Sequence, residues 1–354
     1  MIRWRQGTVV RTLREWPGAL ELEVEVDRQP LVALAYPPLV GRPEPGDTVL
    51  LNTTALALGL GTGGHALVVA MPGRLPADPA GPGHLMKARY TPLQAVVLGV
   101  EEPDSPHHAA IRSADSLDGM PVVVADLHSA LPAIVAGVLA DRPAARIGYV
   151  MTDGGALPLW YSRTVAALRP LLCGTATVGQ AFGGDLEAVT LHTGLLAARH
   201  VQGAEVAVVT QGPGNLGTAT PWGFSGVAAG EAVNAVAALG GHAVAALRLS
   251  GADPRDRHHG ISHHSLTAYG RVALAGADVV VPGGLPPALA AKVAADLTAL
   301  PERHRVVEVD TAGLHDALLR LPVELSTMGR SLGEDPAYFL ACAAAGRHAA
   351  GLLG

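Results

Sequence analysis

From residue 121 onward, short apolar runs alternate with segments of helical periodicity. The apolar runs are residues 122–125, 147–151, 175–178, 206–210, 244–249, 279–281 and 306–309, and the helical segments are 129–139, 160–168, 186–200, 226–239, 265–275, 286–297, 314–319 and 336–353. Such alternation is typical of parallel strands joined by crossover helices. The pattern predicts an α/β domain over residues 121–354, built on a large doubly wound, mainly parallel sheet. A closed eightfold barrel is the alternative, if the strand-like run at 94–100 joins the other seven.

Residues 1–75 have a different pattern. Short strand-like runs at 7–13, 20–26, 31–36, 48–52 and 65–70 are separated by turn residues such as Pro17-Gly18 and Pro45-Gly46. Short strands with dense turn signals predict a small antiparallel, barrel-like β domain. Residues 76–120, which contain Pro76, Pro79 and Pro82, are interpreted as a linker with one connecting strand.

Composition narrows the class of protein. The 354 residues are 49% hydrophobic and 16% charged, which indicates a large buried core and excludes extended disorder. A net charge of −6 makes nucleic acid an unlikely partner and argues against an anionic membrane. Two cysteines are too few for a disulfide framework or a thiolate metal site. The N-terminus has no signal-like apolar stretch, and charged residues interrupt the apolar segment 227–249. We therefore expect a cytoplasmic protein.

Small polar side chains follow the ends of the expected strands. They are Asp126, Asp153, Asp185, Asn215 and Asp253. In open parallel sheets the ligand lies in the crevice outside the strand carboxyl ends, so these residues predict a site at that edge. His128 lies two residues after Asp126, and the two could share a metal ion or a proton. The alternative is that Asp126 accepts backbone hydrogen bonds while His128 packs at the surface.

Glycines accompany these polar residues and predict close approach of a ligand to the backbone. The expected ligand-binding set is Gly154, Gly155, Gly183, Gly184, Gly212, Gly214, Asn215 and Gly217. Ordinary local structure also explains two of the segments that contain these residues. Asp153-Gly154 is a common turn sequence, and Asp185 with Glu187 in the next turn suits a helix N-terminus.

Residues 212–217 contain the G-x-G-x-x-G spacing of dinucleotide-binding loops. Pro213 removes one backbone N–H from the phosphate cradle, and no acidic residue closes a strand about twenty residues later. A nicotinamide cofactor is therefore unlikely. A loop that holds a phosphate or carboxylate through its backbone N–H groups remains possible.

Four histidines lie within residues 258–264, at positions 258, 259, 263 and 264. They could supply metal ligands, or an acid and a base. Ser262 or Ser265 would cap a helix there, so that His263 and His264 lie at its positive end and stay neutral. A divalent metal is a possible cofactor, with its ligands left open. The alternative is a solvated basic loop without a role.

Lys87 and Arg89 lie between the two expected domains. Clefts between domains favour ligands, and this cationic pair could hold an anionic substrate. A surface hinge explains the pair equally well.

Several motifs together resemble a known family. They are the segments 83–94, 124–130, 149–155, 180–185, 211–217 and 262–270, which include Ala125-Asp-Leu-His-Ser129 and Gln211-Gly-Pro-Gly-Asn215. On these segments the chain is similar to an uncharacterised bacterial family, the domain of unknown function 3866, over essentially its full length. The resemblance implies no activity, so no residue role follows from it.

The working hypothesis is an enzyme, a hydrolase or group transferase, that acts on a small anionic metabolite at the strand carboxyl ends. Its expected catalytic residues are Asp126, His128, Asp153, Asp185, His263 and His264. The alternative is a non-catalytic ligand-binding or scaffold protein whose small β domain contacts a partner or nucleic acid. Alanine-rich helices leave apolar surface to cover, so a homodimer is expected.

Overall fold

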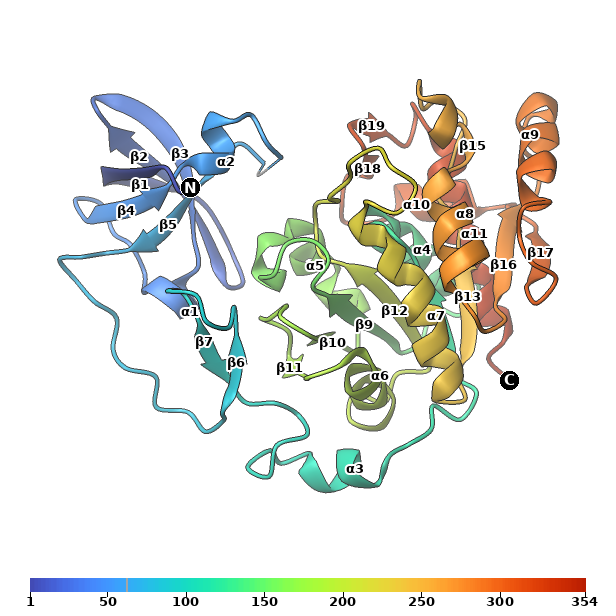
Figure 1. The fold of residues 1–354 in the computed structure, drawn as a ribbon, viewed down its shortest axis with the longest axis horizontal. Helices are drawn as coiled ribbons and strands as arrows, with labels where there is room; N and C mark the ends of the chain where they lie inside the picture. The colour runs from blue at the N-terminus through green and yellow to red at the C-terminus, as the bar shows by residue number, and fades with distance from the viewer. Residues whose placement is uncertain (62) are drawn as a thin grey trace. The chain divides into compact units, whose positions relative to one another are not determined.

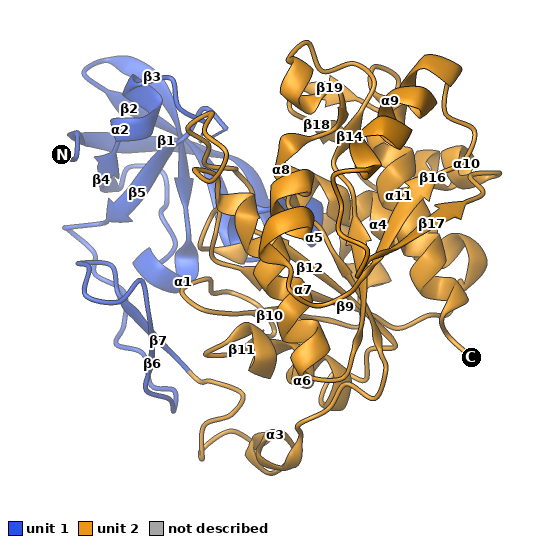
Figure 2. Cartoon of the chain, turned by 45° about the vertical axis from the view of Figure 1, so that its right-hand side comes forward, with its two compact units in different colours: residues 1–97, 160–166 blue, residues 98–159, 167–354 orange. Residues whose placement is uncertain are grey.

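The computed structural model describes residues 1–61 and 63–354. The chain forms two compact units (Figure 2). The first contains residues 1–97 and 160–166, and the second contains residues 98–159 and 167–354.

The first unit is a small β-barrel. Its strands are β1 (Trp4–Trp16), β2 (Ala19–Val26), β3 (Gln29–Ala35), β4 (Thr48–Asn52) and β5 (Ala66–Ala70). They close in the order β1-β2-β3-β5-β4, with β3 and β5 parallel and the other pairs antiparallel. Leu20, Leu22 and Val24 alternate with glutamates along β2, so their side chains fill the interior. The barrel expected from the turn-rich sequence is thus confirmed.

Three short elements complete this unit. They are the helices α1 (Pro37–Val40) and α2 (Thr54–Ala57), and a hairpin of β6 (Leu85–Lys87) with β7 (Ala95–Val97). Residues 160–166 belong to the same unit because Trp160 packs on Tyr36 and accepts a hydrogen bond from the Trp16 indole, 2.7 Å long.

The second unit is built on an eight-stranded parallel sheet (Figure 1). Its strands are β8 (Pro121–Val124), β9 (Ile147–Thr152), β10 (Gly174–Thr177), β11 (Leu186–Glu187), β12 (Val206–Gln211), β13 (His242–Ala246), β16 (Asp278–Pro282) and β17 (Arg305–Val309). Their order is β11-β10-β9-β12-β8-β13-β16-β17, and each adjacent pair is parallel. The sheet is open, as the α/β prediction required, so the closed-barrel alternative is wrong.

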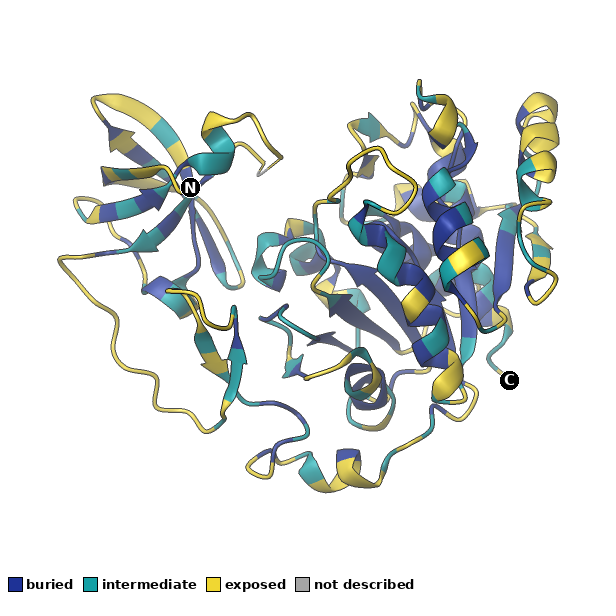
Figure 3. Ribbon diagram, viewed as in Figure 1, coloured by how far each residue is buried: buried dark blue, intermediate teal, exposed yellow. Residues whose placement is uncertain are grey.

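Helices cover both faces of this sheet. The helices of the second unit are α3 (His108–Ser113), α4 (Leu131–Asp141), α6 (Leu191–His200), α7 (Ala228–Ala238), α8 (His263–Thr267), α9 (Pro287–Leu297), α10 (Leu314–Leu319) and α11 (Pro336–Gly351), while α5 (Arg163–Leu168) begins in the first unit. In Figure 1, α6 and α7 lie in front of the sheet, and α4 and α11 lie behind it. The central strands are therefore buried on both faces (Figure 3), which explains their continuous valine runs. Two small hairpins, β14 (Leu249–Ser250) with β15 (Gly260–Ile261) and β18 (Ser326–Thr327) with β19 (Arg330–Ser331), lie in the loops.

One expected helix begins later than its periodicity indicated. Residues 186–187 form strand β11, and α6 starts only at Leu191. The Thr190 hydroxyl caps this helix by accepting a hydrogen bond from the Thr193 amide. Glu187 is buried beside β10 and accepts a 2.7 Å hydrogen bond from the Thr177 hydroxyl. This buried carboxylate pairs with β10 and holds residues 186–187 in the sheet, which a local helical pattern does not reveal.

Helices α4 and α11 cross closely at two glycines. A Cβ at Gly346 would collide with the Ile134 carbonyl oxygen, and one at Gly137 with that of Ala343. We expect Gly346→Ala to destabilise the protein by about 1–3 kcal/mol in urea unfolding, because the helices must separate. Gly351→Ala, in the same helix but with open space around it, is the control and should change stability by less than ~0.5 kcal/mol. Equal effects would contradict the close crossing.

No helix among the described residues is long and apolar enough to cross a membrane.

Candidate functional site

Sheet topology places a switch point at the carboxyl ends of β8 and β13. These strands are neighbours, but the chain leaves β8 toward β9 on one side and leaves β13 toward β16 on the other. Ligand sites in open α/β sheets lie at such switch points. Asp126 follows β8 and Arg248 follows β13, so an acidic and a basic side chain come from the two sides of this point.

Three imidazoles converge on the β13 side of this switch point. The hairpin of β14 and β15 brings His258 against the start of α8, where His263 and His264 lie. One ligating atom from each of these three residues lies within 4.8 Å of the others. Ser262 fixes the arrangement, because its Oγ lies 2.7 Å from His258 Nδ1 and accepts a 3.2 Å hydrogen bond from the His264 amide. We call His258, His263 and His264 the histidine cluster.

His264 links the cluster to both charged residues. Its Nδ1 lies 3.1 Å from Arg248 Nη1 and 3.8 Å from Asp126 Oδ2. Phe224 stacks flat on the His264 ring, with centroids 3.8 Å apart and an interplanar angle of 1°. The Ser265 hydroxyl accepts a 2.9 Å hydrogen bond from the Arg248 amide, which anchors α8 to the end of β13. The His264 ring is therefore held in place by Phe224 on its face and by Arg248 at Nδ1.

Three buried polar atoms at this site have no hydrogen-bond partner among the described residues. They are Asp126 Oδ2, Arg248 Nη2 and His263 Nε2. A buried polar group without a partner is costly, and native structures rarely contain several together. An acceptor, a cationic donor and an imidazole nitrogen are thus left for a ligand, an ion or water.

Burial and nearby arginines keep the cluster uncharged. Burial, helped by Arg248 and Arg255, lowers the pKa of His258 to about 3. Burial also lowers the pKa of His263, followed by the charge of Arg257. Burial likewise lowers the pKa of His264, followed by the charge of Arg248. These directions favour neutral imidazoles, as expected from the sequence, but the causes are burial and cationic neighbours rather than the helix end. Neutral imidazole is the form that binds metals and acts as a base.

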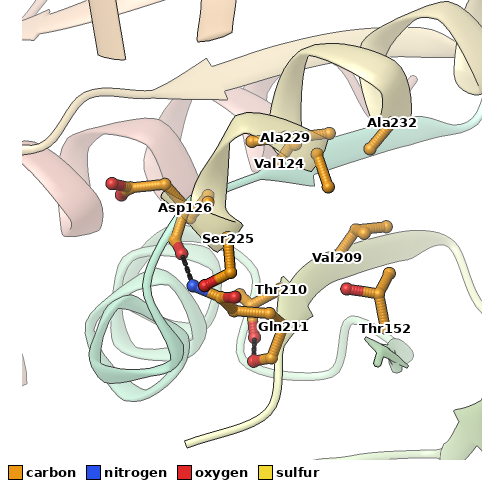
Figure 4. A pocket seen from close by; sticks show the side chains of 12 residues that line it. Val124, Asp126, Thr152, Val209, Thr210, Gln211, Ser225, Ala229 and Ala232 are labelled. Atoms are coloured by element: carbon orange, nitrogen blue, oxygen red, sulfur yellow. Dashed lines mark hydrogen bonds between the residues drawn. The ribbon is translucent and has the colours of Figure 1, made fainter. Parts of the chain in front are cut away.

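The backbone carbonyl and the carboxylate of Asp126 lie in different environments. Its backbone carbonyl accepts a 2.7 Å hydrogen bond from Gln211 Nε2 beside a cavity of about 10 Å³, roughly the size of one water. Thr152, Thr210 and Ser225 are among the residues that line this cavity, and the Asp126 carboxylate points away from it (Figure 4). Burial raises the pKa of this carboxyl group, and the Arg248 charge acts in the opposite direction.

Comparison with protein families identifies the chain. A family model described as protein of unknown function (DUF3866) matches residues 32–346. The chain belongs to the DUF3866 family. This confirms the resemblance read from the sequence motifs. No curated protein and no solved structure matches this DUF3866 protein.

His128 lies at the same sheet edge in a different set of contacts. Its Nδ1 is 3.1 Å from the Tyr149 hydroxyl, which is 2.9 Å from the Thr210 hydroxyl. Burial lowers the pKa of His128 to about 4. These hydrogen bonds join the loop after β8 to strands β9 and β12. His128 therefore stabilises the sheet edge at which the site lies.

Two further predicted residues, Asp153 and Asn215, lie at this edge and stabilise loops. Asp153 Oδ2 accepts a 2.8 Å hydrogen bond from the Gln180 amide. Asn215 Oδ1 accepts hydrogen bonds of 3.0 Å from Gln211 Nε2 and from the Ser225 hydroxyl. The strands that precede Asp126, Asp153 and Asn215 are β8, β9 and β12, which are neighbours in the sheet.

Most of the predicted ligand-binding glycines serve contacts within the chain. A Cβ at Gly155 would collide with the Gly212 carbonyl oxygen, and one at Gly212 with that of Ala156. One at Gly154 would lie 2.7 Å from Gln211 Oε1. Because the loops after β9 and β12 cross here, small residues are required without any ligand. Gly214 and Gly217 have open space around them.

Asp185 is not brought to the histidine cluster. It forms a bidentate ion pair with Arg169 and accepts a 2.8 Å hydrogen bond from the Thr175 amide. Thr175 is in the amino-terminal half of β10, so Asp185 lies away from the carboxyl edge. Gly183 donates a 2.6 Å hydrogen bond to Glu187, and a Cβ at Gly184 would lie 2.9 Å from the Thr177 amide nitrogen. Asp185, Gly183 and Gly184 therefore stabilise the loop between β10 and β11 and do not form part of a ligand site near the histidine cluster.

Three other candidates are held by contacts outside the histidine cluster. Lys87 is buried in β6, and the Arg89 guanidinium lies 5.5 Å from the centre of the Tyr90 ring, both in the first unit. Asp253 pairs with Arg255 and Arg330, and this lowers its pKa although burial opposes the effect. Lys87 and Arg89 therefore lie outside the unit that contains the histidine cluster, whereas Asp253 lies within it and its charge acts on His258.

Sequence reasoning missed Arg248. In the sequence, Arg248 interrupts the apolar run 244–249, and an arginine at the end of a buried strand needs a partner. The arginine side chain is almost fully buried. That contrast between a charged residue and its apolar surroundings was the available signal.

Proposed function

We propose that this protein is a metal-dependent hydrolase or group transferase that acts on a small anionic substrate. The observation that carries the proposal is the convergence of three neutral imidazoles next to a buried aspartate and a buried arginine. Three histidines are a common protein ligand set for catalytic zinc, which keeps a further position open. A divalent metal held there would supply a Lewis acid for a substrate oxygen.

Asp126 is the positioning residue in this proposal. A histidine that binds metal through one ring nitrogen usually donates its other N–H to a carboxylate or carbonyl. Asp126 Oδ2 lies 3.8 Å from His264 Nδ1 and has no other partner among the described residues. In the structure, Arg248 Nη1 donates to His264 Nδ1. Metal on Nε2 would place the His264 proton on Nδ1, so the Arg248 N–H would have to turn away and leave this proton facing the carboxylate. The arrangement leaves His264 Nε2, the unpartnered His263 Nε2 and His258 Nε2 as the expected ligand atoms.

Arg248 is the expected anchor for the negative charge of the substrate. Its Nη2 is buried without a partner, while Nη1 contacts His264. A guanidinium in a partly dry site binds phosphate or carboxylate more strongly than an exposed lysine would. The anion would therefore lie beside the imidazoles, where its electrophilic atom can meet a nucleophile.

The test is turnover of simple anionic substrates. Phosphate monoesters and small carboxylate-bearing amides or esters are incubated with protein loaded with Zn²⁺, Co²⁺ or Mn²⁺. We expect hydrolysis of at least one class, lost on chelation and restored by the metal. Turnover that is identical in the chelated protein and in His263→Ala would contradict the proposal.

A further inference from the structure

A second group of metal-ligating side chains lies at the opposite end of the sheet. His242 begins β13 and Asp278 begins β16, and these parallel neighbours start at the same edge. His348 comes from the last turns of α11, which packs against both strands. Because the histidine cluster follows the carboxyl end of β13, the two groups lie at opposite edges.

We propose that His242, Asp278 and His348 form a second, separate site for a divalent transition metal such as Zn²⁺. Asp278 Oδ2 lies 2.8 Å from His242 Nε2 and 2.7 Å from His348 Nε2. One ligating atom from each of the three residues lies within 4.8 Å of the others. Two imidazoles with one carboxylate are a ligand set for zinc and for other first-row ions, whereas Mg²⁺ and Ca²⁺ prefer oxygen alone.

Arg305 orients the carboxylate. Its Nε donates a 2.7 Å hydrogen bond to Asp278 Oδ1, and its Nη2 also contacts Oδ2. A guanidinium that holds one carboxylate oxygen is a typical outer partner of a metal ligand. Metal entry would move Nη2 away from Oδ2 and would leave Oδ1 on Nε. Each imidazole would then carry its proton on Nδ1, because Nε2 faces the ion.

Solvent reaches this group through a hollow. The hollow has a volume of about 380 Å³, and His242, Asp278, Arg303 and Arg305 contribute to its lining. A metal could enter from this side and keep a position for water or a small anion, which the two arginines would favour. The ion would also tie α11 to the sheet.

The experiment counts bound metal. Protein stripped with a chelator is dialysed against Zn²⁺, and bound zinc is measured per chain in parallel with Co²⁺ absorption spectra. We expect two ions in the wild type, one in His242→Ala and one in His348→Ala. His315→Ala is the control because it removes an exposed imidazole outside both groups. His242 is partly exposed, so its variant serves if His348→Ala does not fold.

The outcomes separate this site from the proposed function. Wild-type protein that binds one ion, lost in His263→Ala but kept in His242→Ala and His348→Ala, overturns the second site alone. One ion that is lost in His242→Ala and kept in His263→Ala supports the second site and contradicts the proposed function. If His242→Ala and His348→Ala bind as many zinc ions as the wild type, with the same affinity, then His242, Asp278 and His348 only hold α11 through hydrogen bonds.

Discussion

Replacing His263 with alanine is expected to weaken Zn²⁺ binding at the carboxyl edge by more than about 100-fold. Loss of a partner in the outer shell of a metal already costs roughly 10–100-fold, and a direct ligand should cost more. His263 Nε2 is buried without a partner, so the substitution removes no hydrogen bond of that atom. Stability should therefore change by only about 1 kcal/mol.

Competition with a chromophoric zinc chelator measures this affinity. His315→Ala provides the matched loss of one imidazole and should bind zinc as the wild type does. To exclude zinc bound at His242, Asp278 and His348, both proteins also carry His242→Ala. If His263→Ala does not change the zinc affinity in this background, the histidine cluster holds no metal.

Replacing Arg248 with methionine is expected to weaken the binding of inorganic phosphate by roughly 30- to 5,000-fold. That range corresponds to the 2–5 kcal/mol typical for loss of a buried charged hydrogen-bonding group. Methionine keeps much of the apolar stem while it removes the guanidinium. Because Arg248 counteracts the burial of Asp126, stability is measured in the same preparation.

Zinc content is the internal control for this variant. If Arg248 anchors the anion, phosphate affinity falls while bound zinc stays at the wild-type level. Loss of both together would instead indicate that the site has collapsed. Unchanged phosphate affinity in a folded, zinc-loaded variant would remove Arg248 from the substrate site.

The sequence located the buried strands well because of their environment. A parallel strand covered on both faces reads as a continuous apolar run, so residues 206–210 predicted β12 (Val206–Gln211) almost to the residue. The run 244–249 was less informative. β13 ends at Ala246, and Leu249 begins a separate strand that pairs with Ile261. A pairing across the 251–259 loop leaves no trace in a local pattern.

The candidate site was only partly predictable for a related reason. The sequence indicates Asp126 because it follows an apolar run, and the histidines because four of them lie within residues 258–264. Their proximity depends on β8 and β13 being neighbours. Strand order is set by long-range packing, not by local periodicity. Asp185 shows the opposite failure. It follows a strand in the sequence, yet the chain turns back and places it beside Thr175.

The central claim is that His258, His263 and His264 together hold a divalent metal. Anomalous diffraction at the zinc edge, on crystals of zinc-loaded protein, tests this most directly. The account predicts a peak about 2.0–2.1 Å from one nitrogen of each imidazole, with Asp126 in contact with His264. A zinc-loaded crystal with no peak among these three rings would contradict it.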